Sequence, residues 1–353
     1  MPRVSLYKRS SRRSAGVLAL SVIAGLGVES CRSTPSQNGR IGGHGVGGMG
    51  IGGLTDASGI AKPVCGRGDA CVECVSDSDC TADPAKPVCD PATNACTRCS
   101  TDAQCAAKLG ADPGVCMSHQ DGRCATVTEA IFLQDTARCA TAAGDNIGSP
   151  DLPFCSVRPA LVALSSDRRL IIIRGTVQAT NYVVQPVAGS AQITFVGQQS
   201  GAIAGGAFSA LAIDGAAVFA RDLTFKLSSA PAVIAKNAGV LSLQHVIVDN
   251  NPGGGVLVDG AGFEIRNTSI TRNGPATTGP TTWGGMLVQN LSALTLRAID
   301  LVTIQNNGGP GLSCSDRIDG TRLLASDNAA SNIGITCQVT PCSPAGPACG
   351  AQP

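Results

Sequence analysis

An asparagine that follows a short apolar run recurs at a regular interval in the second half of the chain. Asn251 and Asn273 are 22 residues apart, and Asn307 follows 34 residues later, after one more period and an insertion. Asn328 ends a further run of the same kind. A repeat of this length, with β-branched runs and Gly/Asn turns, is typical of a β-solenoid, whose turns bury apolar residues only against their neighbours.

Aligning the chain on these asparagines places apolar residues above one another. The superposed sets are Leu241/Phe263, Leu243/Ile265/Ile299, Val246/Thr268/Val302 and Val248/Ile270/Ile304. We therefore expect an all-β parallel solenoid of about seven coils over residues 176–336, because the step is near 22 residues. A stack of the four asparagines, with each amide bridging to the next coil, is favoured over a binding role for these side chains.

Charge and aromatic content exclude several classes of protein. Charged residues make up 14% of the chain and the net charge is +1, which argues against a nucleic-acid partner and against an acidic disordered tail. Aromatic residues make up only 3%, so the chain is poorly suited to a platform that stacks carbohydrate rings.

The cysteine content and the N-terminus indicate export. The chain has 17 cysteines and 3 histidines, which favours disulfides in an oxidising compartment. Basic residues over 3–13 precede the apolar stretch 15–28, which is short for a bilayer span and predicts an export signal. Cys31 follows in a sequence that resembles the lipobox of bacterial lipoproteins, although Glu29 departs from that pattern. A plain secretory signal and a twin-arginine signal are the alternatives.

Five segments follow from these patterns. They are a signal peptide with a predicted lipobox cysteine (1–31), a Gly-rich linker (32–64), a cysteine-rich repeat module (65–124), a β-helix with an N-terminal cap (125–336) and a disulfide-stapled tail (337–353). The linker cannot bury a core, so we expect it to act as a flexible tether.

The cysteine-rich module contains a repeat of 25 residues, in which 71–80 matches 96–105. Its few apolar residues mean that crosslinks must supply stability, at about 2–4 kcal/mol each. Disulfides are expected at Cys65, Cys71, Cys74, Cys80, Cys89, Cys96, Cys99, Cys105, Cys116, Cys124, Cys139, Cys155, Cys314, Cys337, Cys342 and Cys349. A zinc site at the CxxC pairs is the less favoured alternative. Calcium at Asp77, Asp79 and Asp102 is also disfavoured, because Gln104 replaces the second carboxylate in the next repeat, and turn and capping roles are preferred.

Residues 125–175 carry a resemblance to a known family. A Gly/Asn turn at 144–148, a Pro153-Phe154 step, a short helix over 158–164 and the strand 170–177 resemble the first segment of right-handed parallel β-helix proteins of the pectate-lyase-like superfamily. The resemblance implies a right-handed β-helix whose first coil is capped by that helix. Cys139 and Cys155 flank the turn, and we expect them to bridge it.

Many members of that superfamily are enzymes, but no catalytic motif is evident here. Lyases need a carboxylate cluster for calcium and a base, and glycosidases need facing carboxylates. The alignment places Gln244 and Arg266 after Asp222, and Asp300 beside Arg266, so the acids form no column. Asp316, Arg317, Asp319 and Arg322 form a charged patch for which turn chemistry is favoured, and His245 is interpreted as a lone exposed histidine.

Three residues are weak candidates for ligand binding. Trp283 lies in an insertion between coils, over 274–284, where it either stacks on a sugar or packs the loop against the coils, and packing is favoured. Asp222 and Asp300 are the acids to test first. No catalytic residue and no metal ligand is assigned.

Two functions are compatible with the sequence. The favoured one is a non-catalytic exported surface or extracellular protein that binds carbohydrate or matrix, or acts as a spacer, with a lipid anchor as its only membrane contact. The alternative is a polysaccharide lyase or glycosidase with an unrecognised site, and calcium is expected only in that case. The arrangement of anchor, tether, cysteine repeat and β-helix also resembles secreted lipoproteins of myxobacteria, so the predicted location is the outer membrane or the medium.

Overall fold

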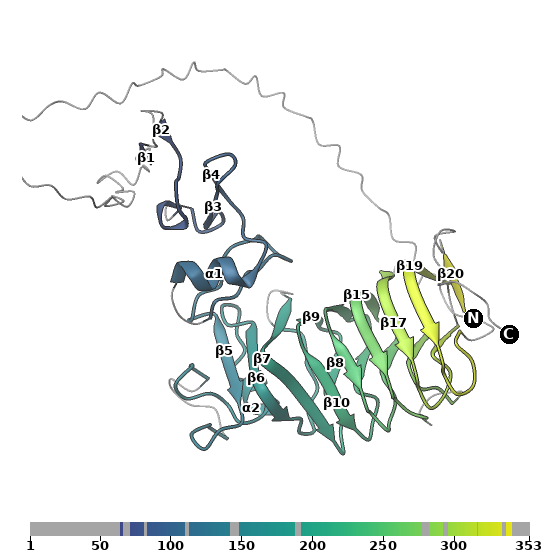
Figure 1. Cartoon of the computed structure of the whole chain (residues 1–353). Coiled ribbons are helices and arrows are strands. Elements are labelled where there is room, and N and C mark those ends of the chain that lie inside the picture. The colour runs from purple at the N-terminus through teal and green to yellow at the C-terminus, as the bar shows by residue number, and fades with distance from the viewer. Residues whose placement is uncertain are drawn as a thin grey trace, which may run out of the picture.

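The computed structural model describes residues 64–65, 71–80, 83–109, 113–141, 148–187, 192–276, 282–291, 296–315, 317–333 and 337–340. The predicted signal peptide with Cys31 and residues 32–63 of the linker lie outside these residues, as do residues 144–147 of the predicted Gly/Asn turn, residues 277–281 of the insertion, Asp316, Cys342 and Cys349. A solenoid of stacked parallel strands forms the main body, and the cysteine-rich module lies above its N-terminal end (Figure 1).

The module contains short elements only. They are β1 (Val64–Cys65), β2 (Cys71–Val72), the 3-10 helix η1 (Asp77–Asp79), β3 (Val88–Asp90), β4 (Ala95–Thr97) and α1 (Asp102–Leu109). The solenoid begins with β5 (Ala130–Gln134) and the helix α2 (Val157–Val162). Neither α-helix in the described part of the chain has the length and hydrophobicity needed to cross a bilayer.

The solenoid has three faces of parallel strands. Five long strands bend at a corner and contribute their first halves to face 1: β6 (Leu170–Gln178), β7 (Ile193–Gly206), β15 (Gly262–Thr271), β17 (Arg297–Gln305) and β19 (Arg317–Ser326). Face 1 also contains the whole of β5, β9 (Ala217–Arg221), β12 (Val240–Gln244) and β20 (Gln338–Thr340). Face 2 contains the second halves of β6, β7, β15, β17 and β19 with β10 (Thr224–Ser228) and β13 (Ile247–Asp249). Face 3 contains β8 (Leu211–Asp214), β11 (Val233–Lys236), β14 (Val256–Asp259), β16 (Met286–Gln289) and β18 (Leu312–Cys314). Face 2 thus counts seven turns, as predicted.

Residues in the left-handed conformation recur in columns at the three corners of the solenoid. The columns are Asp222, His245, Asn267, Leu301 and Arg322 between faces 1 and 2; Leu227, Asn250, Arg272, Asn306 and Asp327 between faces 2 and 3; and Gly215, Asn237, Gly260 and Asn290 between faces 3 and 1. Such a backbone conformation is uncommon for residues other than glycine. Its recurrence shows that the turn geometry is imposed by the stacking of the coils.

The core is a single apolar column inside the three faces. Phe263, Ile265, Ile270 and Ile304 are among the side chains that are fully buried there. The superposed apolar sets are confirmed by the strand register, in which Ile265 pairs with Leu243 on one side and with Ile299 on the other.

One step of the alignment was wrong by a residue. The structure pairs Gln244 with Arg221, whereas the sequence analysis placed Gln244 with Asp222. Asp222 instead occupies the corner column with His245. The error arose because this coil is one residue longer than the 22-residue step that was assumed.

The predicted asparagine ladder is confirmed. The side-chain oxygen of Asn273 accepts hydrogen bonds from the backbone N–H and the side-chain amide of Asn251, at 3.2 and 2.8 Å. The side-chain amide of Asn273 in turn donates to Asn307 at 3.1 Å and to the carbonyl of Val248 at 2.9 Å. All four hydrogen-bonding positions of this fully buried amide are therefore occupied, and none remains for a ligand.

The ladder runs through most of the solenoid. Asn307 continues it to Asn328, and Asn332 supplies the last acceptor, 3.1 Å from the Asn328 side-chain amide. At the other end, the backbone N–H of Ser228 donates to Asn251 at 3.0 Å. The ladder thus satisfies, coil by coil, a backbone N–H group that no strand partner reaches.

The N-terminal end of the solenoid is closed as expected. Val157 and Ala160 of α2 are fully buried against the first coils. Cys139 and Cys155 form a disulfide. At the other end, Cys314 of β18 is bonded to Cys337.

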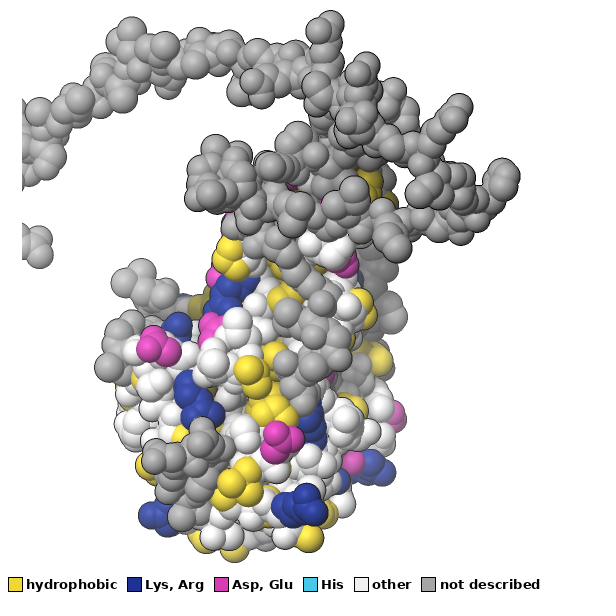
Figure 2. Space-filling view, turned by 90° about the vertical axis from the view of Figure 1, so that its left-hand side faces the viewer, with side chains coloured by type: hydrophobic (Ala, Val, Ile, Leu, Met, Phe, Trp, Pro, Cys, Tyr) yellow, Lys and Arg dark blue, Asp and Glu magenta, His cyan; other side chains and the backbone are white. Residues whose placement is uncertain are grey.

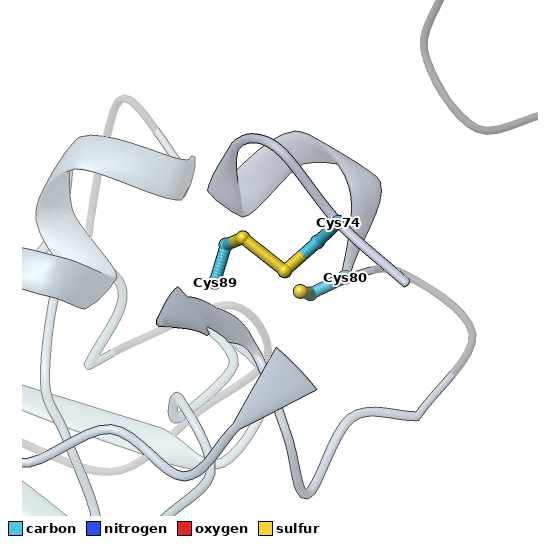
Figure 3. A group of neighbouring side chains, drawn as sticks. All are labelled: Cys74, Cys80 and Cys89. Carbon is cyan, nitrogen blue, oxygen red and sulfur yellow. A yellow bond between two sulfur atoms is a disulfide. The ribbon is translucent and has the colours of Figure 1, made fainter. Parts of the chain in front are cut away.

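The described part of the cysteine-rich module contains two equivalent disulfide units. Cys74–Cys89 and Cys80–Cys96 form the first unit, and Cys99–Cys116 and Cys105–Cys124 form the second. Figure 3 shows Cys80 beside the Cys74–Cys89 bond. These sulfurs lie close enough to suggest a metal site, but sulfurs joined in disulfides cannot act as thiolate ligands. Disulfides at this density indicate an oxidising environment.

The acidic positions of the repeat hold the backbone. Asp77 accepts a hydrogen bond from the N–H of Cys89 at 2.7 Å, and Asp102 accepts one from Cys116 at 2.8 Å. Asp79 accepts from the N–H of Ser76 at 2.9 Å, and Gln104 accepts from Ser100 at 2.8 Å. A neutral amide oxygen serves as well as a carboxylate in this capping position, which explains the exchange of Asp79 for Gln104 between the repeats.

Replacing one rung of the ladder tests its contribution to stability. We expect Asn273→Ala to lower the free energy of unfolding by about 3 kcal/mol, because the N–H of Asn251 is left buried without an acceptor. Urea denaturation followed by circular dichroism measures the change. The control is Asn181→Ala, at an exposed position, with an expected change below about 0.5 kcal/mol. Equal effects of the two substitutions would contradict a structural role for the ladder.

Candidate binding groove on face 1

The outward side chains of face 1 change in character along the solenoid. One column of stacked positions reads Phe132, Ile172, Val196, Arg221, Gln244, Arg266, Asp300 and Thr321. The neighbouring column reads Ala130, Leu170, Thr194, Phe219, Ser242, Glu264, Ala298 and Asp319. The first coils are therefore apolar on their outer surface as well as inside, and the later coils are polar outside.

The second cysteine repeat covers the apolar part of face 1. Val115, Met117 and Ala125 pack with outward residues of the first coils, including Phe132 and Ile172, in one buried cluster. The repeat has too few apolar residues to form a core of its own, and it buries them against the solenoid instead. Apolar residues on both faces of a sheet indicate that both faces are covered.

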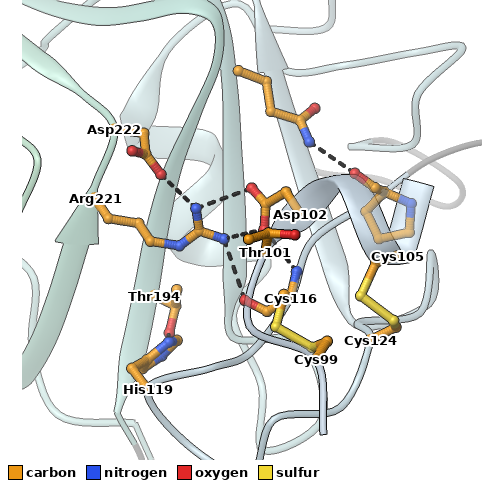
Figure 4. A network of polar contacts seen from close by, with 12 residues as sticks. Cys99, Thr101, Asp102, Cys105, Cys116, His119, Cys124, Thr194, Arg221 and Asp222 are labelled. Atoms are coloured by element: carbon orange, nitrogen blue, oxygen red, sulfur yellow. Dashed lines mark hydrogen bonds and ion pairs between the residues drawn. A yellow bond between two sulfur atoms is a disulfide. The ribbon is translucent and has the colours of Figure 1, made fainter. Parts of the chain in front are cut away.

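Arg221 fastens the repeat to the solenoid. It lies on β9 and is 8% exposed. Its guanidinium donates to both carboxylate oxygens of Asp102, at 2.9 and 2.6 Å, and to the carbonyl of Cys116 at 3.2 Å (Figure 4). It also pairs with Asp222. A guanidinium that is largely removed from water is stabilised by this set of charged and backbone acceptors.

His119 lies next to this ion pair and faces the solenoid. Its ring stacks on Phe219 with a centroid distance of 3.9 Å and an interplanar angle of 10°. Its Nε2 atom is 3.0 Å from the hydroxyl of Thr194. Burial and, to a smaller extent, the positive charge of Arg221 lower the pKa of His119 to about 4. The imidazole is therefore neutral at neutral pH, and Arg221 is the cation of this contact.

Beyond the repeat, two hollows lie in line on face 1. The first has a volume of about 330 Å³ and is lined by Ser118, His119, Phe219, Ser242, Leu243, Gln244, Glu264 and Arg266. The second has a volume of about 340 Å³ and is lined by Arg266, Ala298, Ile299, Asp300, Asp319, Gly320 and Thr321. Arg266 belongs to both, and we call the two hollows together the face 1 groove. Its size is within the range of small-molecule binding sites.

The carboxylates around the groove are paired with arginines. Arg322 donates to Asp300 through Nε at 2.9 Å and through a terminal nitrogen at 2.5 Å. Glu264 pairs with Arg266. Asp319 and Arg317 lie 3.8 Å apart. Balanced charges of this kind leave the groove polar without making it strongly acidic or basic.

Asp300 is held in its charged form. Hydrogen bonds from Arg322 and Thr321 lower the pKa of Asp300 to about 2. A carboxylic acid with so low a pKa holds almost no proton at neutral pH, so it is a poor general acid. The arrangement is suited to hydrogen bonding and to positioning a ligand.

The sequence candidates for ligand binding lie in different places. Asp300 is at the groove, and Asp222 is at the corner above the covered coils, three strands away or about 14 Å. Trp283 is on another face and is fully buried with Leu257, Ala276 and Leu287 against the outside of face 3. The possibility that Trp283 stacks on a sugar is therefore wrong, because its ring is used to pack the insertion onto the coils.

The predicted charged patch near the C-terminal coils consists of separate ion pairs. Arg322 turns toward Asp300 and Arg317 toward Asp319. His245 is half exposed at its corner, with Nδ1 3.6 Å from a carboxylate oxygen of Asp222. Arg221 points outward from β9 but is covered by the repeat.

Most of the groove could not be predicted from the sequence. His119, Phe219, Ser242, Gln244 and Arg266 come from the module and from successive coils, and no spacing marks them as a group. One signal was available. The runs 130–133 and 170–173 are apolar without alternation, which indicates strands covered on both sides.

A further hollow of about 770 Å³ lies at the N-terminal end, beside α2, and is lined mainly by apolar residues such as Leu161, Val162 and Val183. Arg158 is its only charged lining residue among those described. Figure 2 looks onto this end and shows hydrophobic, basic and acidic side chains scattered over it. The mixture gives this end no chemical character as a site.

Fold and groove together define the class of the protein: a parallel β-solenoid with a docked, disulfide-rich repeat. No family model matches the chain, and no curated protein matches it. Among solved structures it is similar to the crystal structure of pectate lyase Pel9A, with 12% identity and a TM-score of 0.29, over 63% of this chain and 82% of that one. A likeness this weak says nothing about activity, and the fold is established by the strand register itself.

The ion pair between Arg221 and Asp102 can be tested against its equivalent in the first repeat. We expect Asp102→Ala to lower the free energy of unfolding by about 2 kcal/mol more than Asp77→Ala. Both substitutions remove an acceptor for a cysteine N–H, but only Asp102 also pairs with Arg221. Urea denaturation measures both changes. Equal losses would show that the ion pair adds nothing to docking.

Titration of Asp300 tests the ion pair at the groove. The folded pKa of about 2 is below the value of about 3.9 for an unfolded aspartate, so Asp300 stabilises the fold above about pH 4 and this contribution is lost as the pH falls toward 2. Carboxyl ¹³C NMR should show little protonation of Asp300 at pH 3. Arg322→Gln should raise the pKa of Asp300, and Arg272→Gln, at the ion pair with Asp249, should not. A pKa near 4 in the unmodified protein would contradict the contact.

Proposed function

We propose that the protein is a non-catalytic exported surface or extracellular protein that binds a neutral polysaccharide chain along the face 1 groove. The observation that carries the proposal is the pairing of the groove carboxylates with arginines. The pairs of Asp300 with Arg322 and of Glu264 with Arg266 present hydrogen-bonding groups, and the lowered pKa of Asp300 keeps that acid charged. Paired groups of this kind can bind hydroxyls, and a carboxylate with a pKa as low as that of Asp300 does not deliver a proton.

The repetition of the coils supports a polymeric ligand. Neighbouring strands lie about 4.8 Å apart, so each coil presents its outward side chains at a constant step. Ser242, Gln244, Glu264, Arg266 and Thr321 offer donors and acceptors along this direction. A linear chain of sugars can meet successive coils with equivalent contacts. The balance of acidic and basic groups favours a hydroxyl-rich neutral chain over a polyanion.

The alternative is a polysaccharide lyase or glycosidase of the pectate-lyase-like superfamily, with calcium as the cofactor of a lyase. A glycosidase needs two carboxyl groups about 5–9.5 Å apart, one of them able to carry a proton. Calcium needs several oxygen ligands on one centre. The groove acids among the described residues are instead neutralised by Arg266, Arg317 and Arg322. This favours binding without turnover.

Export and anchoring complete the proposal. The disulfides of the module indicate an oxidising environment. The basic and apolar N-terminus, Cys31 and the Gly-rich linker of the sequence support a lipidated, tethered protein, in keeping with the resemblance to secreted myxobacterial lipoproteins. On an anchor of this kind the stiff solenoid also acts as a spacer that holds the groove away from the membrane.

Affinity gel electrophoresis of the full-length mature protein tests the proposal. The gels contain laminarin, xylan or glucomannan as neutral polymers, and polygalacturonate, alginate or hyaluronan as acidic ones. We expect retardation by at least one neutral polymer and a weaker effect of the acidic set. Arg266→Gln should weaken the retardation by about tenfold in apparent affinity, which corresponds to the loss of about one charged hydrogen bond.

Arg272→Gln is the matched control, because Arg272 is also an exposed, carboxylate-paired arginine but lies away from the groove. Incubation with the acidic polymers, with and without calcium, is followed by absorbance of unsaturated products. Product formation that is lost in Asp300→Asn or Asp222→Asn would establish the enzyme instead. The absence of retardation by every polymer would reject carbohydrate binding.

A further inference from the structure

Among the residues that the structure describes, the face 1 groove is closed at one end and open at the other. Ser118 and His119 of the second repeat line the hollow next to Phe219. At the opposite end Asp319 and Thr321 are exposed on β19. The groove therefore has a direction, set by the position of the repeat on the solenoid.

The closed end is a fixed wall. His119 is held by its stack on Phe219 and its contact with Thr194, and Cys116, three residues earlier, is tied to Cys99 by a disulfide. The carbonyl of Cys116 also accepts a hydrogen bond from Arg221. A loop with this many restraints does not open as a lid, because each opening would break a stacked contact and an ion-paired arginine network.

The outer surface does not continue beyond the wall. Thr194 is 1% exposed and Val196 is fully buried on the next coil, where the repeat packs on face 1. A polymer lying in the groove has no path past Ser118 and His119. On the other side, the groove follows the outer sides of β12, β15, β17 and β19, over about 14 Å of stacked coils.

We propose that the groove binds the end of a polysaccharide chain, with the terminal sugar against Ser118 and His119 and the rest of the chain directed toward Asp300 and Asp319. This inference rests on the proposed carbohydrate-binding function. His119 contributes through the shape of its fixed ring, because its Nε2 atom is engaged with Thr194 and its Nδ1 atom is buried. The wall selects chain ends by shape. A sugar inside the chain is linked to another sugar on each side, and one of these would clash with the repeat.

Stoichiometry with polymers of different length tests the inference. Laminarin, xylan and glucomannan are each separated into long and short fractions and titrated into the full-length mature protein by isothermal titration calorimetry. Binding at chain ends predicts one protein per chain in every fraction that binds. The amount of protein bound at saturation then equals the molar concentration of chains, whatever their length. Binding along the chain predicts a number of proteins per chain that rises with length.

A substitution at the wall adds a second readout. Ser118→Arg places a bulky side chain at the closed end, and we expect it to weaken the binding of short fractions by about tenfold or more. Ser269→Arg is the matched control on the outside of face 2, where Ser269 has no role in the groove. Its binding should equal that of the unmodified protein.

The outcomes separate the two proposals. If no fraction of the three polymers binds, the carbohydrate-binding function and the end-binding inference both fail. If fractions bind with many proteins per chain, or if Ser118→Arg leaves the binding unchanged, the groove binds carbohydrate but the chain-end inference is overturned. One protein per chain at all lengths, together with weakening by Ser118→Arg, supports both.

Discussion

The register between neighbouring coils is the constraint on which the rest of the structure depends. No single coil buries its apolar residues, and a slip of one position would turn the core side chains outward. Inward residues such as Ile265 match above and below, and the buried asparagine ladder fixes the same register with directional bonds. Because the register is exact over many coils, the outward side chains also fall into straight columns, and one pair of these columns forms the groove.

The cysteine-rich module shows how one repeat sequence acquires two roles. Asp77 and Asp102 hold equivalent cysteine N–H groups in the two units. Only Asp102 also meets Arg221, because only the second unit lies on face 1. Disulfides keep each unit folded without a core of its own. The second unit adds an apolar cluster with the solenoid, and in doing so it covers the early coils and defines where the groove begins.

The chemistry of the groove follows from the pairing of its carboxylates with arginines, and not from the number of acidic residues. Asp300 has the charge that a calcium ligand would need, but Arg322 and Thr321 engage its oxygens, and its lowered pKa leaves it almost no proton to donate as a catalytic acid. Glu264 is also paired with an arginine, Arg266, so the groove presents fixed donors and acceptors. This surface suits recognition of hydroxyl groups, and the wall at His119 gives it an end.

The sequence by itself determined the solenoid, its number of coils, the asparagine ladder and the disulfide character of the module, because stacking repeats the same local pattern of Leu, Ile and Asn at each turn. It could not determine the site. Asp222 was misplaced by one residue because coil length varies, and Trp283 was ambiguous because burial depends on what the insertion packs against. Only the tertiary structure decided that Ser118 and His119 meet Phe219, since residues so far apart in the chain are brought together by docking of the module, which leaves no periodic signal.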